Sequence, residues 1–202
     1  MPSQPTHTDR LLRLAQKKGL LRAGDLAALD IPRVYLSRLT ADGQLTRAGH
    51  GLYRLADTTL SEHESLAIVA ARVPQAVFCL LSALQFHTLT TQLPRQVWIA
   101  LPQGSHAPRI DYPPVKLIQY SGDAFTEGIE THRIDRVDLR VYSVAKTVAD
   151  CFKHRNKIGI DVALEALKDA RAQKKASADA LWRYAKICRV ANVMRPYLEA
   201  VE

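Results

Sequence analysis

The chain has 202 residues, of which 47% are hydrophobic and 24% charged, a balance that supports a buried core and excludes a disordered tail or a fibre. The 28 Lys and Arg residues against 20 Asp and Glu give a net charge of +8, and no apolar run is long enough for a membrane-spanning helix. Residues 1–56 carry +5, residues 57–135 carry −3 and residues 136–202 carry +6, so we expect an anionic polymer to meet the basic ends.

Residues 1–56 show the pattern of three short helices followed by a β-hairpin. The first expected helix is capped by Thr8 or Asp9 and ends at Gly19, and the second covers 23–29. The third begins at Pro32, runs through Val34, Leu36 and Leu39, and ends near Asp42 and Gly43. Two strands over 44–47 and 52–55 follow, joined by the loop 48–51. Three helices and a hairpin in this order predict a winged helix-turn-helix.

A winged helix suits DNA because its third helix fits the major groove and its hairpin reaches the flanking backbone or the minor groove. The amphipathic pattern turns several polar side chains of the third helix outward, and further cations lie at the wing and around the end of the first helix. The candidate DNA-binding residues are Arg33, Tyr35, Ser37 and Arg38 on the helix, Arg47 and His50 on the wing, and Lys17, Lys18 and Arg22 at the first turn. Arg33 and Arg38 also fit a solvated helix face, and Tyr35 also fits the core.

The segment 56–60 is polar and predicts a linker, so we expect a winged helix over 1–56 and a second domain over 61–202. Ser61 and Glu64 have the spacing of a capping box for a helix that ends before Pro74. An apolar run over 76–81 and a short helix over 82–89 follow. Four strands are expected over 96–101, 115–120, 129–134 and 137–142.

From Ser143 the pattern is helical to the end of the chain, with Ser143 and Ser177 placed to cap helices and a further helix over 161–173. The second domain is therefore expected to be α+β, with a mostly antiparallel sheet and a helical C-terminal layer. Asp150 and Glu165 lie within apolar helical sequence, which predicts a buried pairing with Lys or Arg or a contact with a partner.

Three stretches, taken in order, resemble the AbiEi antitoxins, the DNA-binding halves of type IV abortive-infection toxin–antitoxin pairs. They are the wing sequence GHGLYR at 49–54, the sequence LSALQFHTLT at 81–90 before the strand VWIAL at 97–101, and the sequence YSVAKTVADCF at 142–152. The resemblance implies a winged helix that represses its own operon at inverted repeats of double-stranded DNA, and a second domain that opposes a nucleotidyltransferase-like toxin and supports DNA binding.

The resemblance stops near residue 172, and the basic residues beyond it fit either an extended DNA footprint or a solvated helix face. They are Lys174, Lys175, Arg183, Lys186, Arg189 and Arg195.

The sequence offers little for an enzyme, a metal site or a cofactor. Asp111 and Asp138 lack the acidic partner and the lysine that a metal-dependent nuclease needs, and the seven histidines form no H-x-x-x-H pair. Ser82 lacks a nucleophile-elbow setting, and Cys151 lies in an apolar helical face. We therefore expect a non-enzymatic protein without a cofactor. A protein-interaction module built on a winged-helix scaffold is the alternative.

The N-terminal sequence and the cysteine spacing indicate the cellular compartment. Its first residues are polar and have no apolar stretch of the signal-peptide kind, which predicts a cytoplasmic protein without membrane contact. Cys79, Cys151 and Cys188 are odd in number and contain no C-x-x-C spacing, so neither a disulfide framework nor a zinc ribbon is expected.

Overall fold

The structure is a computed structural model that describes residues 5–58 and 61–200. The chain divides into two compact units, one of Met1–Pro74 with Ile110–Pro113 and Arg133–Leu139, and one of the remaining segments. Thr59 and Leu60 of the expected linker, and residues 1–4 and 201–202 of the expected domains, lie outside the described residues. Each unit is considered by itself.

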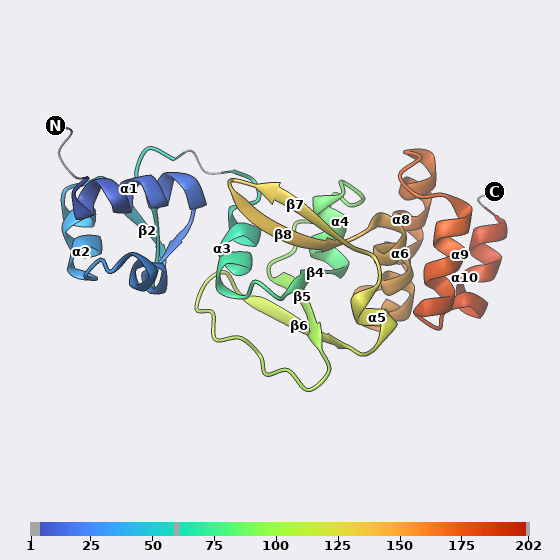
Figure 1. The fold of residues 1–202 in the computed structure, drawn as a ribbon. Helices are drawn as coiled ribbons and strands as arrows, with labels where there is room; N and C mark the ends of the chain where they lie inside the picture. The colour runs from blue at the N-terminus through green and yellow to red at the C-terminus, as the bar shows by residue number, and fades with distance from the viewer. Residues whose placement is uncertain (1–4, 59–60, 201–202) are drawn as a thin grey trace. The chain divides into compact units, whose positions relative to one another are not determined.

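The first unit contains the elements of a winged helix in the expected order (Figure 1). They are α1 (His7–Lys18), β1 (Leu21–Arg22), the 3-10 helix η1 (Ala23–Leu29), α2 (Val34–Ala41), β2 (Leu45–Gly49) and β3 (Leu52–Leu55). The three strands form an antiparallel sheet in the order β1-β3-β2. Helix α3 (Glu64–Arg72) follows in the same unit.

One apolar core holds the winged helix together. Its buried side chains come from α1, β1, η1, α2 and β2, and they are Leu11, Ala15, Leu21, Leu26, Ile31, Leu36, Leu39 and Leu45. Leu36 and Leu39 lie three residues apart on one side of α2, so this side faces the core and the opposite side is left for solvent or a ligand.

Two predicted helix starts in the winged helix are wrong. Thr6 caps α1, because its hydroxyl accepts a hydrogen bond from the backbone N–H of Asp9, whose carboxylate accepts from the backbone N–H of Thr6 in return. Helix α2 begins at Val34 and not at Pro32, whose carbonyl accepts from the N–H of Tyr35 in a preceding turn. The ends predicted at Gly19 and Gly43 are confirmed, and both glycines have φ of +72°.

The second unit contains most of a five-stranded sheet in the order β6-β5-β4-β8-β7, while the end of β7 and the start of β8 fall within Arg133–Leu139 of the first unit. The strands are β4 (Val77–Phe78), β5 (Val97–Pro102), β6 (Val115–Tyr120), β7 (Ile129–Ile134) and β8 (Val137–Tyr142). Strand β4 pairs antiparallel with β5 and parallel with β8, and β5 pairs parallel with β6. The α+β class is confirmed, and the sheet itself is mixed because a segment of more than ten residues separates β5 from β6 and allows a parallel return.

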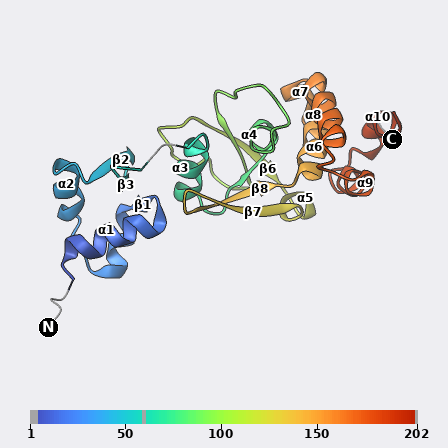
Figure 2. The same cartoon turned by 90° about the horizontal axis from the view of Figure 1, so that it is seen from above.

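Helices cover the C-terminal end of this unit and confirm the predicted helical layer (Figures 1 and 2). They are α6 (Val144–Lys153), α7 (Arg155–Ile158), α8 (Ile160–Ala172), α9 (Ala178–Ile187) and α10 (Ala191–Glu199), whereas α4 (Leu80–Phe86) and α5 (Asp123–Thr126) come earlier, between strands. Helix α6 packs against α4, α8, α9 and α10, so it is the central helix of the layer.

Of the three helix caps predicted beyond residue 60, two are confirmed and one is wrong. Ser143 caps α6 and Ser177 caps α9, since each hydroxyl accepts a hydrogen bond from a backbone N–H three residues later. The capping box expected at Ser61 and Glu64 is wrong, because α3 begins at Glu64 and the Ser61 hydroxyl accepts from the N–H of His63 instead. A short turn therefore separates Ser61 from the helix.

The core of the second unit encloses an ion pair. The Lys146 ammonium lies 2.6 Å from a carboxylate oxygen of Asp150, and both side chains are 0% exposed. The ammonium also lies 4.1 Å from the ring centroid of Tyr142 and 4.7 Å from that of Tyr120, and the Cys188 thiol donates to the second Asp150 oxygen at 3.3 Å. The buried partner expected for Asp150 is therefore confirmed, whereas Glu165 is only half-buried on α8.

Cys79, Cys151 and Cys188 are free thiols that lie buried in this same core. Burial raises the pKa of all three, to about 12 for Cys188, with a further contribution from the neighbouring Asp150 carboxylate. The protonated thiol is the inert form, so these cysteines act as small apolar side chains.

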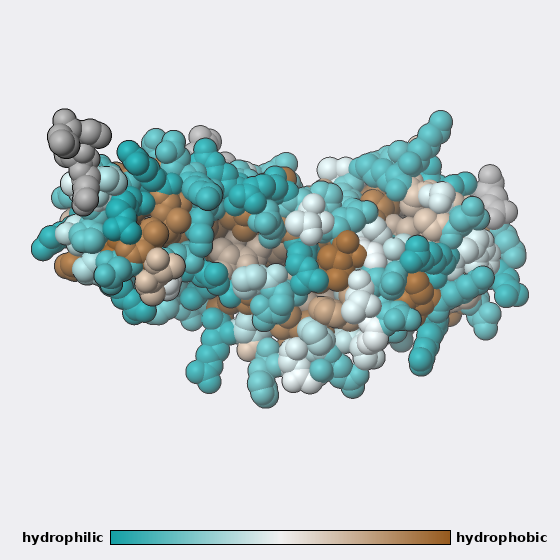
Figure 3. Space-filling model, viewed as in Figure 1, coloured by the Kyte–Doolittle hydropathy of each residue, from teal (hydrophilic) through white to brown (hydrophobic). Residues whose placement is uncertain are grey.

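None of the helices in residues 5–58 and 61–200 is long and apolar enough to cross a bilayer. The face shown in Figure 3 is mostly hydrophilic, with hydrophobic side chains scattered over it. Within the same described ranges, no group of His, Cys, Asp and Glu is arranged to hold a metal ion.

Acid is expected to destabilise the protein through His154, which follows α6. Burial lowers the pKa of His154 to about 4 from 6.5, helped by Lys157, Lys153 and Lys146. The unfolded chain then binds more protons between these two values, so stability should fall as the pH drops from 6.5 to about 4. Because the ring is partly exposed, we expect about 1–2 kcal/mol rather than the full linkage value.

Urea unfolding at several pH values would measure this loss, with His154→Gln as the variant. The stability of the variant should depend less on pH in this window. Part of the pH dependence should remain, because burial also lowers the pKa of His87. A variant whose profile equals that of the wild type would show that His154 is not the group responsible.

Candidate nucleic-acid interface

The outward side of α2 carries three of the predicted DNA-binding residues. Arg33, Ser37 and Arg38 are all exposed, and the helical repeat places Ser37 and Arg38 on the side opposite Leu36 and Leu39. Arg33 precedes the first helical residue, and its carbonyl accepts from the N–H of Leu36 at 3.0 Å. The two guanidiniums thus flank the first turns of the helix, where recognition helices contact base edges.

Tyr35 has a different place from the other α2 candidates. Its ring is half-buried and packs against the core of the winged helix, and it lies 5.3 Å from the ring of His7. The guanidinium carbon of Arg38 lies 5.6 Å from the Tyr35 ring centroid, within range of a cation–π contact. Tyr35 therefore supports Arg38 from beneath and connects the exposed side of α2 with the core.

The wing presents two exposed candidates, Arg47 on β2 and His50 on the turn between β2 and β3. The register of this hairpin shifts between Arg47 and Gly49, which marks a β-bulge. Arg47 donates from Nε to the Gly49 carbonyl at 3.2 Å, and its Nη2 lies 3.4 Å from Nδ1 of His50. The bulge and these contacts hold both side chains at the tip of the wing, a position that suits contact with a phosphate backbone.

The third group of candidates lies around the turn that follows α1. Lys17 is exposed, whereas the Lys18 ammonium lies 2.7 Å from the Asp25 carboxylate. Burial opposes ionisation of Asp25, but hydrogen bonds from Lys18 and from the backbone N–H of Arg22 outweigh it and lower the pKa of Asp25. Asp25 therefore offsets part of the positive charge of Lys18 and Arg22.

Sequence reasoning missed Val34, which it took as an apolar position of the third helix. Val34 is 49% exposed and lies on the same side of α2 as Ser37 and Arg38. The signal was present in the spacing, because Val34 precedes the buried Leu36 by two residues and so points about 200° away from it.

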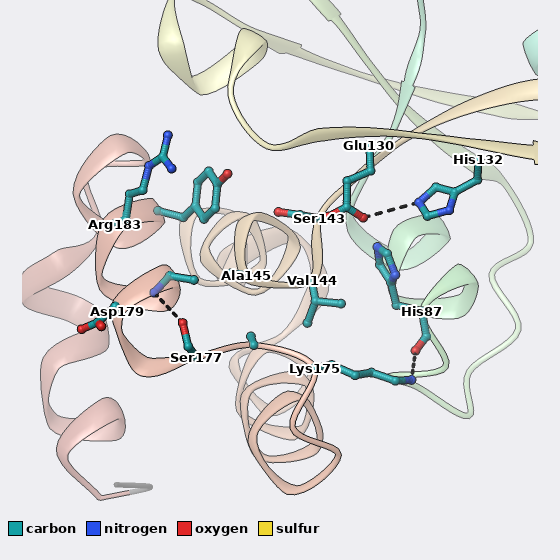
Figure 4. Close-up of a pocket in the computed structure, with 13 residues that line it drawn as sticks. His87, Glu130, His132, Ser143, Val144, Ala145, Lys175, Ser177, Asp179 and Arg183 are labelled. Carbon is teal, nitrogen blue, oxygen red and sulfur yellow. Dashed lines mark hydrogen bonds and ion pairs between the residues drawn. The ribbon is translucent and has the colours of Figure 1, made fainter.

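A cleft of about 710 Å³ lies in the second unit, between α9, the start of α6 and the end of α4 (Figure 4). Glu130 and His132 pair at 3.4 Å across its upper rim, and Lys175 donates to the His87 carbonyl. Lys175 also donates to the Thr88 hydroxyl at 2.6 Å. His87 is half-buried, with Nε2 2.7 Å from the Tyr142 carbonyl, and burial lowers its pKa.

Several polar groups of this cleft have structural partners. Ser143 and Ser177 act as helix caps, and Arg183 pairs with Glu127 at 2.7 Å. Because Lys175 and Arg183 both contact protein groups, two members of the basic C-terminal cluster are accounted for by the packing of the unit itself. The cleft shows no pairing of a hydroxyl with an imidazole among its described lining residues.

The N-terminal part is a winged helix-turn-helix, as its element order (helix, strand, helix, helix, strand, strand) and its sheet order β1-β3-β2 show. Residues 9–56 match a family model described as "Transcriptional regulator, AbiEi antitoxin". This match confirms the predicted resemblance to the AbiEi antitoxins, and it runs from Asp9, within α1, to the end of β3, with all nine candidate DNA-binding residues inside it.

The fold of most of the chain is also found in a solved structure, that of the RV2827C protein from Mycobacterium tuberculosis. The two chains share 16% sequence identity with a TM-score of 0.61, and the similarity covers 90% of this chain and 72% of the other. At this identity the similarity concerns the fold alone. A comparison with the curated proteins gave no match.

Proposed function

We propose that this protein is a DNA-binding autorepressor and the antitoxin of a type IV, AbiE-like pair, acting in the cytoplasm. The observation that carries the proposal is the exposed basic side of α2 on a winged helix that matches a transcriptional-regulator family. In this proposal residues 1–56 bind inverted repeats in the chain's own promoter, and residues 61–202 oppose a nucleotidyltransferase-like toxin. The proposal includes no catalytic step and no cofactor.

The role of each candidate residue follows from where it lies. Arg33, Ser37 and Arg38 enter the major groove, since Arg pairs with the edge of guanine and Ser can contact either a base or a phosphate. Tyr35 positions Arg38, and Arg47 and His50 hold the wing on the backbone. Of the three cations near the end of α1, Lys17 contacts a DNA phosphate. Lys18 and Arg22 contribute less to the attraction of phosphates because the Asp25 carboxylate lies beside them.

Gel shifts of the full chain on its own upstream DNA, at several salt concentrations, test the proposal. Each phosphate contact contributes about −0.9 to the slope of log affinity against log salt, so a steep slope is expected. Arg38→Ala should cost about 1–3 kcal/mol and relax discrimination at one position if the guanidinium reads a base edge. If Arg38 contacts only phosphate, the variant should weaken binding to all sequences alike and reduce the slope by about one.

Two results would contradict the proposal in different ways. Binding without salt dependence, or no binding, would leave the winged helix as a scaffold for protein contacts, which is the alternative function. Binding that Arg38→Ala leaves unchanged would remove Arg38 from the interface. Arg95→Ala is the matched control, since it removes an exposed arginine from the second unit.

A further inference from the structure

Val34 is an exposed large apolar side chain next to polar ones. It is the first residue of α2 and is 49% exposed, and within the described residues 5–58 it is the only large hydrophobic side chain of this kind. An interface with another protein would favour a contiguous apolar patch. The residues around Val34 on this side of the helix are Arg33, Ser37 and Arg38, all exposed.

The helical repeat places Val34 on the same side of α2 as the groups proposed to enter the groove. Residues three and four apart are neighbours on a helix surface, so Val34 lies beside both Ser37 and Arg38. The N-terminal residues of a recognition helix are those that contact base edges. A helix docked through Arg38 therefore brings the two methyl groups of Val34 to the floor of the groove.

The major groove offers one apolar group, the 5-methyl group of thymine. We propose that Val34 recognises this methyl group, on a thymine next to the base that Arg38 contacts. The inference rests on the proposed function and adds a base identity to it: Arg38 supplies the polar contact and Val34 the apolar one. A cytosine or purine at this position would leave Val34 without its apolar partner.

Uracil tests this contact because it lacks the 5-methyl group and keeps the base-pairing edge of thymine. Full-length wild-type protein and Val34→Ala would each be titrated on the chain's upstream DNA prepared with thymine and with uracil. Wild type should bind uracil DNA about fourfold more weakly for each methyl group it contacts, which is the value of one buried methyl-sized group converted to affinity. Val34→Ala should bind both DNAs with nearly equal affinity.

The four affinities form a cycle in which any effect of uracil on the DNA itself cancels, because both proteins meet the same DNA. Alanine favours a helix more than valine does, so the variant should fold, which its melting temperature would confirm. Leu93→Ala is the matched control, since Leu93 is 81% exposed and lies in the second unit; it should show the same thymine preference as the wild type.

The possible failures are distinguishable. The thymine contact would be overturned if binding is salt-sensitive but the wild type does not distinguish thymine from uracil. It would also be overturned if Val34→Ala keeps the full preference for thymine. In both cases the proposed repressor function would stand. An absence of salt-sensitive binding by every protein to every DNA would overturn both. Thymine preference in wild type and Leu93→Ala, lost in Val34→Ala, is the supporting result.

Discussion

Lys146→Met is expected to lower the free energy of unfolding of the second unit by about 3–5 kcal/mol, because it leaves the Asp150 carboxylate charged, buried and without its partner. Burial raises the pKa of Asp150, and the Lys146 ammonium opposes that rise. Without Lys146 the carboxyl group must either take up a proton or remain ionised in an apolar core. Either outcome costs stability, and the contacts of the ammonium with the Tyr120 and Tyr142 rings are lost as well.

Urea unfolding followed by tryptophan fluorescence would measure this loss. Both tryptophans, Trp98 and Trp182, belong to the second unit and pack against its core, so their signal reports this unit. Lys153→Met is the matched control, since it makes the same change at an exposed position of α6. The double change Lys146→Met with Asp150→Leu should recover most of the loss, because it removes both charges. A loss no larger than that of Lys153→Met would contradict the prediction.

The double change of Arg33 and Arg38 to Ala is expected to weaken binding to the upstream DNA by about 2–6 kcal/mol if both guanidiniums read base edges, and by less if they contact phosphates. Both side chains are exposed beside the first turns of α2, and neither contributes to the core. The folded state should therefore survive the change, and the salt slope should fall by up to about two.

Gel shifts together with melting curves would separate a lost contact from a lost fold. Arg95→Ala with Arg109→Ala is the control, because it removes two exposed positive charges from the second unit. Equal weakening by the two double variants would mean that net charge alone governs binding, and the specific role of α2 would then have to be abandoned.

Local pattern was sufficient for elements whose signal is local. The strands over 115–120, 129–134 and 137–142 have the predicted bounds, because alternating side chains and clear turn residues define them. Ser143 and Ser177 were predicted as caps for the same reason. Strand β1 was missed because two residues show no period, and its pairing with β3 brings Leu21 opposite Tyr53 from a distant part of the chain.

Tertiary contacts decided what local pattern left open. Thr6, Thr8 and Asp9 all suit a cap, and only the reciprocal bonds between Thr6 and Asp9 select the first. The strand order of the larger sheet depends on which faces the helices cover, which no single segment encodes. In the candidate interface, the arginines were predictable from charge and spacing. The exposure of Val34 could be predicted from its spacing to Leu36, but it was missed because an apolar residue in an amphipathic helix is normally assigned to the core.

The three buried thiols give the native chain internal reporters of transient opening. An alkylating reagent reacts with thiolate, and the folded protein keeps Cys79, Cys151 and Cys188 protonated and enclosed. Alkylation therefore requires the helices around α6 to open locally, and its rate depends on how often they open. One of the three thiols, Cys188, donates a hydrogen bond to Asp150. The labelling rate of Cys188 therefore measures how strongly the buried ion pair stabilises the packing of the C-terminal helices.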